Sequence, residues 1–190
     1  MKAKLLSLFT VALVIAVGFS SCKKDDPEVL PKVVTLGAQS NTTISGFYSF
    51  SKEKTYSLNE ASQNQADIDL FCFYEEGNDI AFGGPASNIK GIFGGEDNDP
   101  TNWTTQNETR FLELPDVTVA DFDALEDGDE AIMNYYDENE GRRKSKLLTK
   151  DQIWSVKTRI GSDNETYVLV KILEVTDGET GSVKFEYITK

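Results

Sequence analysis

The chain has 190 residues with 32 acidic and 19 basic side chains, so its formal net charge is −13. This charge repels nucleic-acid phosphates, which argues against nucleic acid as a partner. The sequence contains no histidine, so it lacks the commonest general base, a common zinc ligand and every serine–histidine or cysteine–histidine nucleophile pair. We therefore predict that the protein is not an enzyme.

Residues 1–21 are predicted to be a lipoprotein signal peptide. Lys2 and Lys4 precede an uncharged apolar run at residues 5–19, which is too short for a spanning helix of about 20 apolar residues. Small residues then lead into Cys22. This arrangement resembles the lipobox of bacterial lipoproteins, in which acyl chains such as palmitate on the cysteine anchor the mature chain. The alternative is an ordinary cleaved signal with a chance cysteine.

Residues 22–32 are predicted to be the lipidated cysteine and a flexible tether, because they are charged and contain two prolines. Lys23, Lys24, Asp25 and Asp26 resemble the basic-then-acidic export signal that follows the lipidated cysteine in Bacteroidetes lipoproteins. That resemblance implies a surface-exposed position on the outer membrane, with the lipid anchor as the contact to the membrane. The alternative is a solvated charged tether without a sorting role.

Residues 33–190 are predicted to form a single β-rich domain. Removing residues 1–21 from the 190-residue chain leaves 169 residues, which is enough for one core but not obviously for two. Alternation of apolar and polar residues predicts a strand at residues 42–50, and the doubly apolar stretch at 68–74 predicts a central strand covered on both faces. Cys72 in that stretch is predicted to be a small core residue.

Short helices and further strands complete the predicted domain. Thr118 and Asp121 resemble an acidic capping box, so a helix is predicted at residues 119–126. Apolar spacing predicts other helical segments, and alternation predicts a C-terminal three-stranded antiparallel meander with short turns. The remaining helical segments are predicted at residues 59–65, 85–90 and 129–138, and the remaining strands at 80–82, 109–114, 153–160, 167–175 and 181–189.

The glycine-rich loop at residues 83–103 is the first candidate site. Its aromatic residues Phe93 and Trp103 are of the type that stacks on sugar rings or hydrophobic ligands; alternatively, they pin the loop to the core. The same loop carries acidic residues whose oxygens calcium prefers, without the spacing of an EF-hand, so a solvated loop is the alternative. These potential calcium ligands are Glu96, Asp97 and Asp99.

A family resemblance covers about residues 42–189. It rests on the motifs IWSVKT, YVLVKI and FEY in the last forty residues, and on ADIDL and DIAF upstream. With these motifs the chain resembles the HmuY-like lipoproteins of Bacteroidetes. The resemblance implies a mainly β, sandwich-like antiparallel fold with a few helices, and ligand capture, since known members bind haem through axial histidine or methionine.

Haem is disfavoured as a cofactor here because the chain has no histidine. The remaining candidate ligands are Met133, Tyr135 and Tyr136, since tyrosine can also hold haem iron. Their helical spacing equally suits core packing.

We thus predict a non-catalytic, lipid-anchored surface lipoprotein that binds a small ligand or a partner. One alternative is a structural or accessory lipoprotein of a nutrient-uptake complex, with an outer-membrane transporter as its partner. The other is a carboxylate-dependent hydrolase, which is supported only by the large number of acidic residues.

Overall fold

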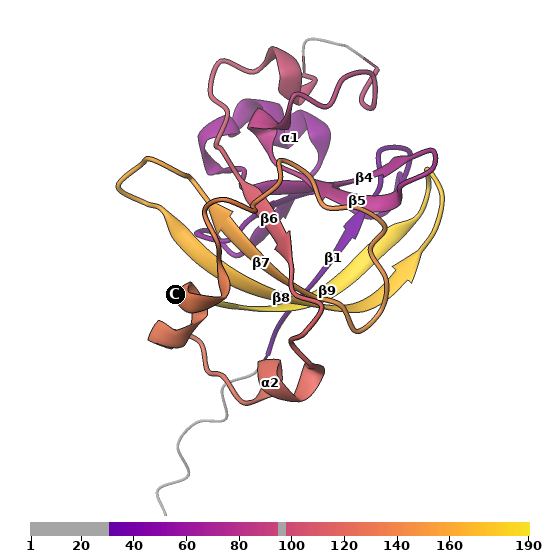
Figure 1. The fold of residues 1–190 in the computed structure, drawn as a ribbon. Coiled ribbons are helices and arrows are strands. Elements are labelled where there is room, and N and C mark those ends of the chain that lie inside the picture. Colours follow the sequence, from indigo (N-terminus) through magenta and orange to yellow (C-terminus); the bar gives the residue numbers. More distant parts are fainter. Residues whose placement is uncertain (1–30, 95–97) are drawn as a thin grey trace, which may run out of the picture. The chain divides into compact units, whose positions relative to one another are not determined.

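A computed structural model describes residues 31–94 and 98–190 of the protein (Figure 1). The predicted signal peptide, Cys22 and the export signal lie outside the described residues, as do Glu96 and Asp97. Within those two ranges, no helix has the length and apolar character needed to cross a bilayer.

The described chain folds into two antiparallel sheets with a few short helices, which confirms the mainly β prediction. The five-stranded sheet has the order β1-β9-β8-β7-β6 and the four-stranded sheet the order β3-β2-β4-β5. The predicted C-terminal meander is confirmed as β7, β8 and β9, with a register shift in β8 between Ile172 and Glu174. The strands are β1 (Lys32–Gly37), β2 (Phe47–Ser49), β3 (Lys54–Tyr56), β4 (Leu70–Glu75), β5 (Asp79–Gly83), β6 (Arg110–Glu113), β7 (Ile153–Thr158), β8 (Thr166–Thr176) and β9 (Ser182–Thr189).

The main hydrophobic core lies between the inner faces of the two sheets. The rings of Phe82 and Phe185 meet edge to face, with centroids 5.3 Å apart. The hydroxyls of Tyr48 and Tyr187 share a buried hydrogen bond of 2.8 Å. Phe82 lies in β5 and Tyr48 in β2 of the four-stranded sheet, and both of their partners lie in β9 of the five-stranded sheet. These contacts therefore hold the two sheets face to face.

Smaller hydrophobic clusters cover the two outer faces. On the outer face of the four-stranded sheet, Phe71 and Phe73 pack with Trp103, whereas Leu70 and Cys72 of the same strand face the main core. Both faces of β4 are therefore buried, as the unbroken apolar run predicts. Figure 1 shows helix α1 (Leu58–Gln63) and the long loop on one side of the domain and helix α2 (Val119–Asp123) on the other.

The helical predictions are confirmed in one case and corrected in three. The capping box of Thr118 and Asp121 begins α2 as predicted. Helix α1 is capped by Ser57, and it begins one residue and ends two residues earlier than the predicted segment at 59–65. The segment predicted as a helix at residues 129–138 is the 3₁₀ helix η4 (Glu130–Tyr135), and the turn predicted at 85–90 is only η2 (Pro85–Ser87). Two further 3₁₀ turns, which the sequence pattern did not predict, are η1 (Gln65–Asp67) and η3 (Pro100–Asn102).

The strand predicted at residues 42–50 is wrong over its first half. Only Phe47–Ser49 forms a strand, and residues 38–46 form a loop between β1 and β2. The cause is the side chain of Asn41, whose Oδ1 accepts hydrogen bonds from the backbone N–H groups of Thr43 and Ile44 at 3.0 and 2.9 Å. Such local bonds compete with strand pairing.

A buried ion pair also joins the sheets. Arg159, in the turn after β7, places its Nε 2.7 Å from Oδ1 of Asp69, which directly precedes β4. The two side chains are 12% and 1% exposed. Burial raises the pKa of the Asp69 carboxyl, and the Arg159 guanidinium opposes that shift.

Candidate ligand-binding pocket

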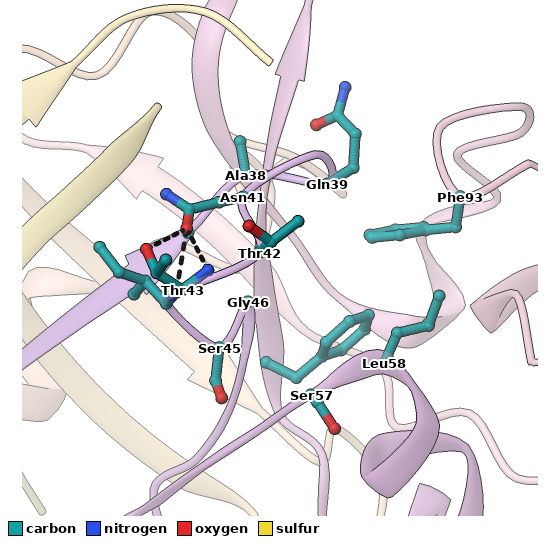
Figure 2. A pocket seen from close by; sticks show the side chains of 13 residues that line it. Ala38, Gln39, Asn41, Thr42, Thr43, Ser45, Gly46, Ser57, Leu58 and Phe93 are labelled. Carbon is teal, nitrogen blue, oxygen red and sulfur yellow. Dashed lines mark hydrogen bonds between the residues drawn. The ribbon is translucent and has the colours of Figure 1, made fainter. Parts of the chain in front are cut away.

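A pocket of about 170 Å³ opens beside the loop between β1 and β2. Figure 2 shows that residues of this loop form one side, while Leu58 at the start of α1 and Phe93 of the long loop form the other. The lining consists of Gly37, Ala38, Gln39, Asn41, Thr42, Thr43, Ile44, Ser45, Gly46, Phe47, Ser57, Leu58 and Phe93. None of these side chains is an acid, a base or a cysteine.

Asn41 holds the polar side of the pocket in place. Besides accepting from the backbone of Thr43 and Ile44, its side chain donates from Nδ2 to the carbonyl oxygens of Thr180 and Gly181 at 2.8 and 3.1 Å. Those two carbonyls belong to the turn before β9. The asparagine therefore ties its own loop to the five-stranded sheet, and the wall has little freedom to move.

Close backbone packing at Gly37 restricts the loop further. A Cβ atom at Gly37 would lie 2.5 Å from the carbonyl oxygen of Ile44 and 2.8 Å from Cβ of Asn41. Real Cβ atoms do not approach a backbone oxygen so closely, so only glycine fits here. The polar wall is thus largely formed before any ligand arrives, which lowers the entropic cost of binding.

Phe93 provides the apolar side of the pocket. Its ring centroid lies 5.2 Å from that of Phe47 and 5.2 Å from that of Phe71, so part of the ring packs on the four-stranded sheet. The remainder is half-buried, and Figure 2 shows the ring extending toward Thr42 with Leu58 beside it. An aromatic surface and a polar wall therefore face one another across the hollow.

Two hydroxyl groups of the pocket are unused within the described part of the chain. Neither Thr42 nor Ser45 makes a side-chain hydrogen bond there, and Thr42 is exposed. By contrast, the Ser57 hydroxyl is occupied by the capping box of α1, where it donates to Glu60 Oε2 at 2.9 Å. Thr42 and Ser45 can each donate and accept one bond to a ligand.

The chemical character of the pocket is set by an aromatic ring and small polar groups. Its lining carries no group that titrates near neutral pH, so it supplies neither a general acid nor a general base. An aromatic ring opposite hydroxyl and amide groups matches the surface of a sugar, which has apolar C–H faces and a polar edge.

Trp103, the other aromatic residue predicted to contact a ligand, is placed in the interior. It is 5% exposed, and its ring centroid lies 5.8 Å from that of Phe47. Its indole Nε1 donates to the carbonyl oxygen of Asn98 at 2.7 Å. These contacts pin the long loop to the sheet, which is the alternative stated for this residue.

Asp99 has a structural role at the start of η3. Its Oδ1 accepts from the backbone N–H of Thr101 at 2.9 Å and from the Thr101 hydroxyl at 2.8 Å, and the residue is fully buried. Among the residues with described positions, no group of three or more histidine, cysteine or carboxylate residues is arranged to hold a metal ion. The calcium site at Glu96, Asp97 and Asp99 stays a prediction, since Glu96 and Asp97 lie outside the described ranges.

Met133, Tyr135 and Tyr136 lie over the outer face of the five-stranded sheet, away from the pocket. Met133 is 38% exposed, and Tyr135 packs beside the buried Ile132. The ring of Tyr136 meets that of Tyr167 edge to face at 6.0 Å. Burial, followed by the Glu138 carboxylate, raises the pKa of Tyr136 to about 12, which opposes the tyrosinate that haem iron prefers.

Phe93 could be identified from the sequence, but the polar wall opposite it could not. Residues 42–45, TTIS, match a period of two, and this alternation predicts a strand. The usable signal was Asn41 followed by two threonines, since asparagine readily accepts bonds from the backbone two or three residues ahead.

No protein-family model matches the sequence, and neither does any curated protein. The structure is similar to the crystal structure of a DUF4466 family protein from Parabacteroides merdae, with a TM-score of 0.53 and 17% sequence identity. The match covers 87% of this chain but only 56% of that protein, so this chain spans little more than half its length. The likeness establishes a β-rich fold that also occurs in Bacteroidetes, and it does not single out the HmuY-like family.

Proposed function

We propose that the protein is a lipid-anchored lipoprotein of the outer-membrane surface that binds a saccharide and does not transform it. The single observation that supports binding is the pocket in which the half-buried ring of Phe93 faces the unused hydroxyls of Thr42 and Ser45. The lack of histidine in the chain and of titratable groups in the pocket lining supports a non-catalytic role.

The anchor in this proposal rests on Cys22 and the charged residues after it. A lipid-anchored domain with a preformed pocket would hold a nutrient near an uptake system, which agrees with the HmuY-like resemblance of the β motifs. Haem is not the proposed ligand, because the residues of the pocket offer no iron ligand among their side chains. If cells fed with labelled palmitate do not label the protein, or if Cys22→Ala leaves its membrane association unchanged, the anchoring proposal fails.

Saccharide binding is tested by saturation-transfer NMR and calorimetry on the mature chain with a panel of neutral monosaccharides. We expect weak binding by the native protein and loss of binding in Phe93→Ala. Because Phe93 also packs on Phe47 and Phe71, Thr42→Val provides a variant that removes an exposed hydroxyl without disturbing the core. It should weaken binding by about three- to tenfold, the value of one hydrogen bond.

Met133→Ala is the matched control, because Met133 is exposed on the other side of the domain. It should leave the affinity unchanged. Equal binding by native protein and Thr42→Val, or loss of binding in Met133→Ala, would place the ligand elsewhere and contradict the proposed pocket.

A further inference from the structure

A second hollow adjoins the pocket along the same two segments of chain. It measures about 420 Å³ and is lined by Gln39, Ser40, Tyr74, Glu75, Glu76, Gly91, Ile92 and Glu179. The two hollows share Gln39, and successive residues of the long loop line them, Ile92 the second hollow and Phe93 the first. They therefore lie end to end between the loop after β1 and residues 91–93.

Gln39 is held in a fixed position where the two hollows meet. Its Oε1 accepts from the backbone N–H of Tyr74 at 2.7 Å, and its Nε2 donates to the Tyr74 carbonyl at 3.0 Å. Both ends of the amide are thus bonded to β4. Figure 2 shows the amide directed away from Leu58 and Ser57, so it does not fill the first hollow.

Apolar surface continues from the first hollow into the second. Ile92 and Phe93 both pack partly buried against the outer cluster of the four-stranded sheet. Tyr74 also lines the second hollow, but its half-buried side chain packs against the main core on the other face of β4. Each hollow thus combines a partly exposed large side chain with polar edges, and a single sugar in the first would leave the second unused.

We propose that the two hollows form one groove for an uncharged oligosaccharide, with one sugar ring against Phe93 and the next against Ile92. This inference rests on the proposed function, because it names the class of saccharide for the same site. The groove predicts that affinity rises when a second sugar is added.

The charges around the second hollow determine which oligosaccharides are accepted. Glu75 is bonded to Lys144 and Asn78. Glu76 and Glu179 are exposed and have no ion-pair partner among the residues that the structure places. Their carboxylates repel an anionic ligand, so oligosaccharides of uronic acids or with sulfate groups should bind poorly.

The test is calorimetry of the mature chain with glucose, xylose and their linear oligomers of increasing length, alongside oligogalacturonates. For the neutral series that binds, we expect about a tenfold gain from one sugar to two and a smaller gain beyond. Ile92→Ala should remove most of that gain while leaving the monosaccharide affinity within about twofold. Glu179→Gln should improve binding of the galacturonates, whereas Glu174→Gln, an exposed acid on β8 paired with Lys184, should not.

The outcomes separate this inference from the proposed function. If monosaccharides bind and Thr42→Val weakens them, but affinity does not grow with length, the groove is wrong and the pocket stands. The same conclusion follows if Ile92→Ala weakens sugars of every length equally. If no sugar of any length binds, both proposals fail together.

Discussion

Replacing Arg159 with methionine should leave the buried carboxylate of Asp69 without its ion-pair partner. In the native protein, Asp69 receives the guanidinium of Arg159 at 2.7 Å and the backbone N–H of Phe50 at 2.8 Å. Methionine preserves much of the apolar stem but removes the charge. Because both side chains are nearly inaccessible to solvent, we expect the free energy of unfolding to fall by about 3–5 kcal/mol, the usual cost of removing one partner of a buried pair.

The cost should depend on pH in a defined direction. Burial already raises the pKa of Asp69 above its ordinary 3.8, and Arg159 opposes that rise. Without Arg159, the folded protein holds the Asp69 proton to higher pH than the unfolded chain does. Stability then falls as pH increases from the ordinary pKa through the raised one. The destabilisation by Arg159→Met should therefore be greatest at neutral pH and smaller near pH 4.

Urea unfolding followed by tryptophan fluorescence at both pH values measures this effect. Lys184→Met is the matched control, because Lys184 pairs with Glu174 at 3.2 Å on an exposed surface, and its loss should cost within about 0.5 kcal/mol. A loss below about 1 kcal/mol for Arg159→Met at neutral pH, or a loss that grows on acidification, would refute the assignment of this ion pair as the buried link between the sheets.

Three further predictions follow from the structure. Asn41→Ala removes the bonds that fix the pocket wall and should lower the free energy of unfolding in urea by about 2–3 kcal/mol. The control Asn139→Ala, at an exposed turn, should lower it by less than about 0.5 kcal/mol. Equal losses in the two variants would contradict the fixed wall. Burial raises the pKa of the Cys72 thiol, so maleimide should label this thiol only as fast as the protein unfolds. Rapid labelling of the native protein would show that the thiol is accessible and would contradict its burial. The hydrogen bond from Lys144 lowers the pKa of Glu75, and Lys144→Met should reduce the free energy of unfolding at neutral pH by roughly 0.2–1 kcal/mol. This stability difference should shrink as pH falls below 4.5. A difference that does not depend on pH would argue against the pair.

Strands buried on one or both faces could be predicted from the sequence. The meander follows from alternation in the last forty residues, and the burial of both faces of β4 follows from LFCFY at residues 70–74. The pairing of β1 with β9 could not be predicted, because it joins residues about 150 positions apart, such as Val34 and Phe185, and no local pattern encodes such a contact.

The pocket was only half predictable for a similar reason. Phe93 is conspicuous as an aromatic residue in a glycine-rich loop. Its polar partners are small residues whose alternation resembles that of a strand. Asn41 overrides that pattern by accepting bonds from the backbone of Thr43 and Ile44, and its bonds to the turn before β9 join residues far apart in the sequence. Trp103 is the opposite case, since the sequence left both ligand contact and packing on the core open, and tertiary contacts with Phe47 bury it.

The most direct test of saccharide binding in this pocket is an amide chemical-shift map of the mature chain, titrated with the tightest-binding neutral oligosaccharide. The structure predicts that the amide signals of Thr42, Ser45, Ile92 and Phe93 move together with one dissociation constant, while the signal of Met133 remains still. Movement confined to residues 133–136, or no saturable movement at residues 42–45, would contradict the proposed site.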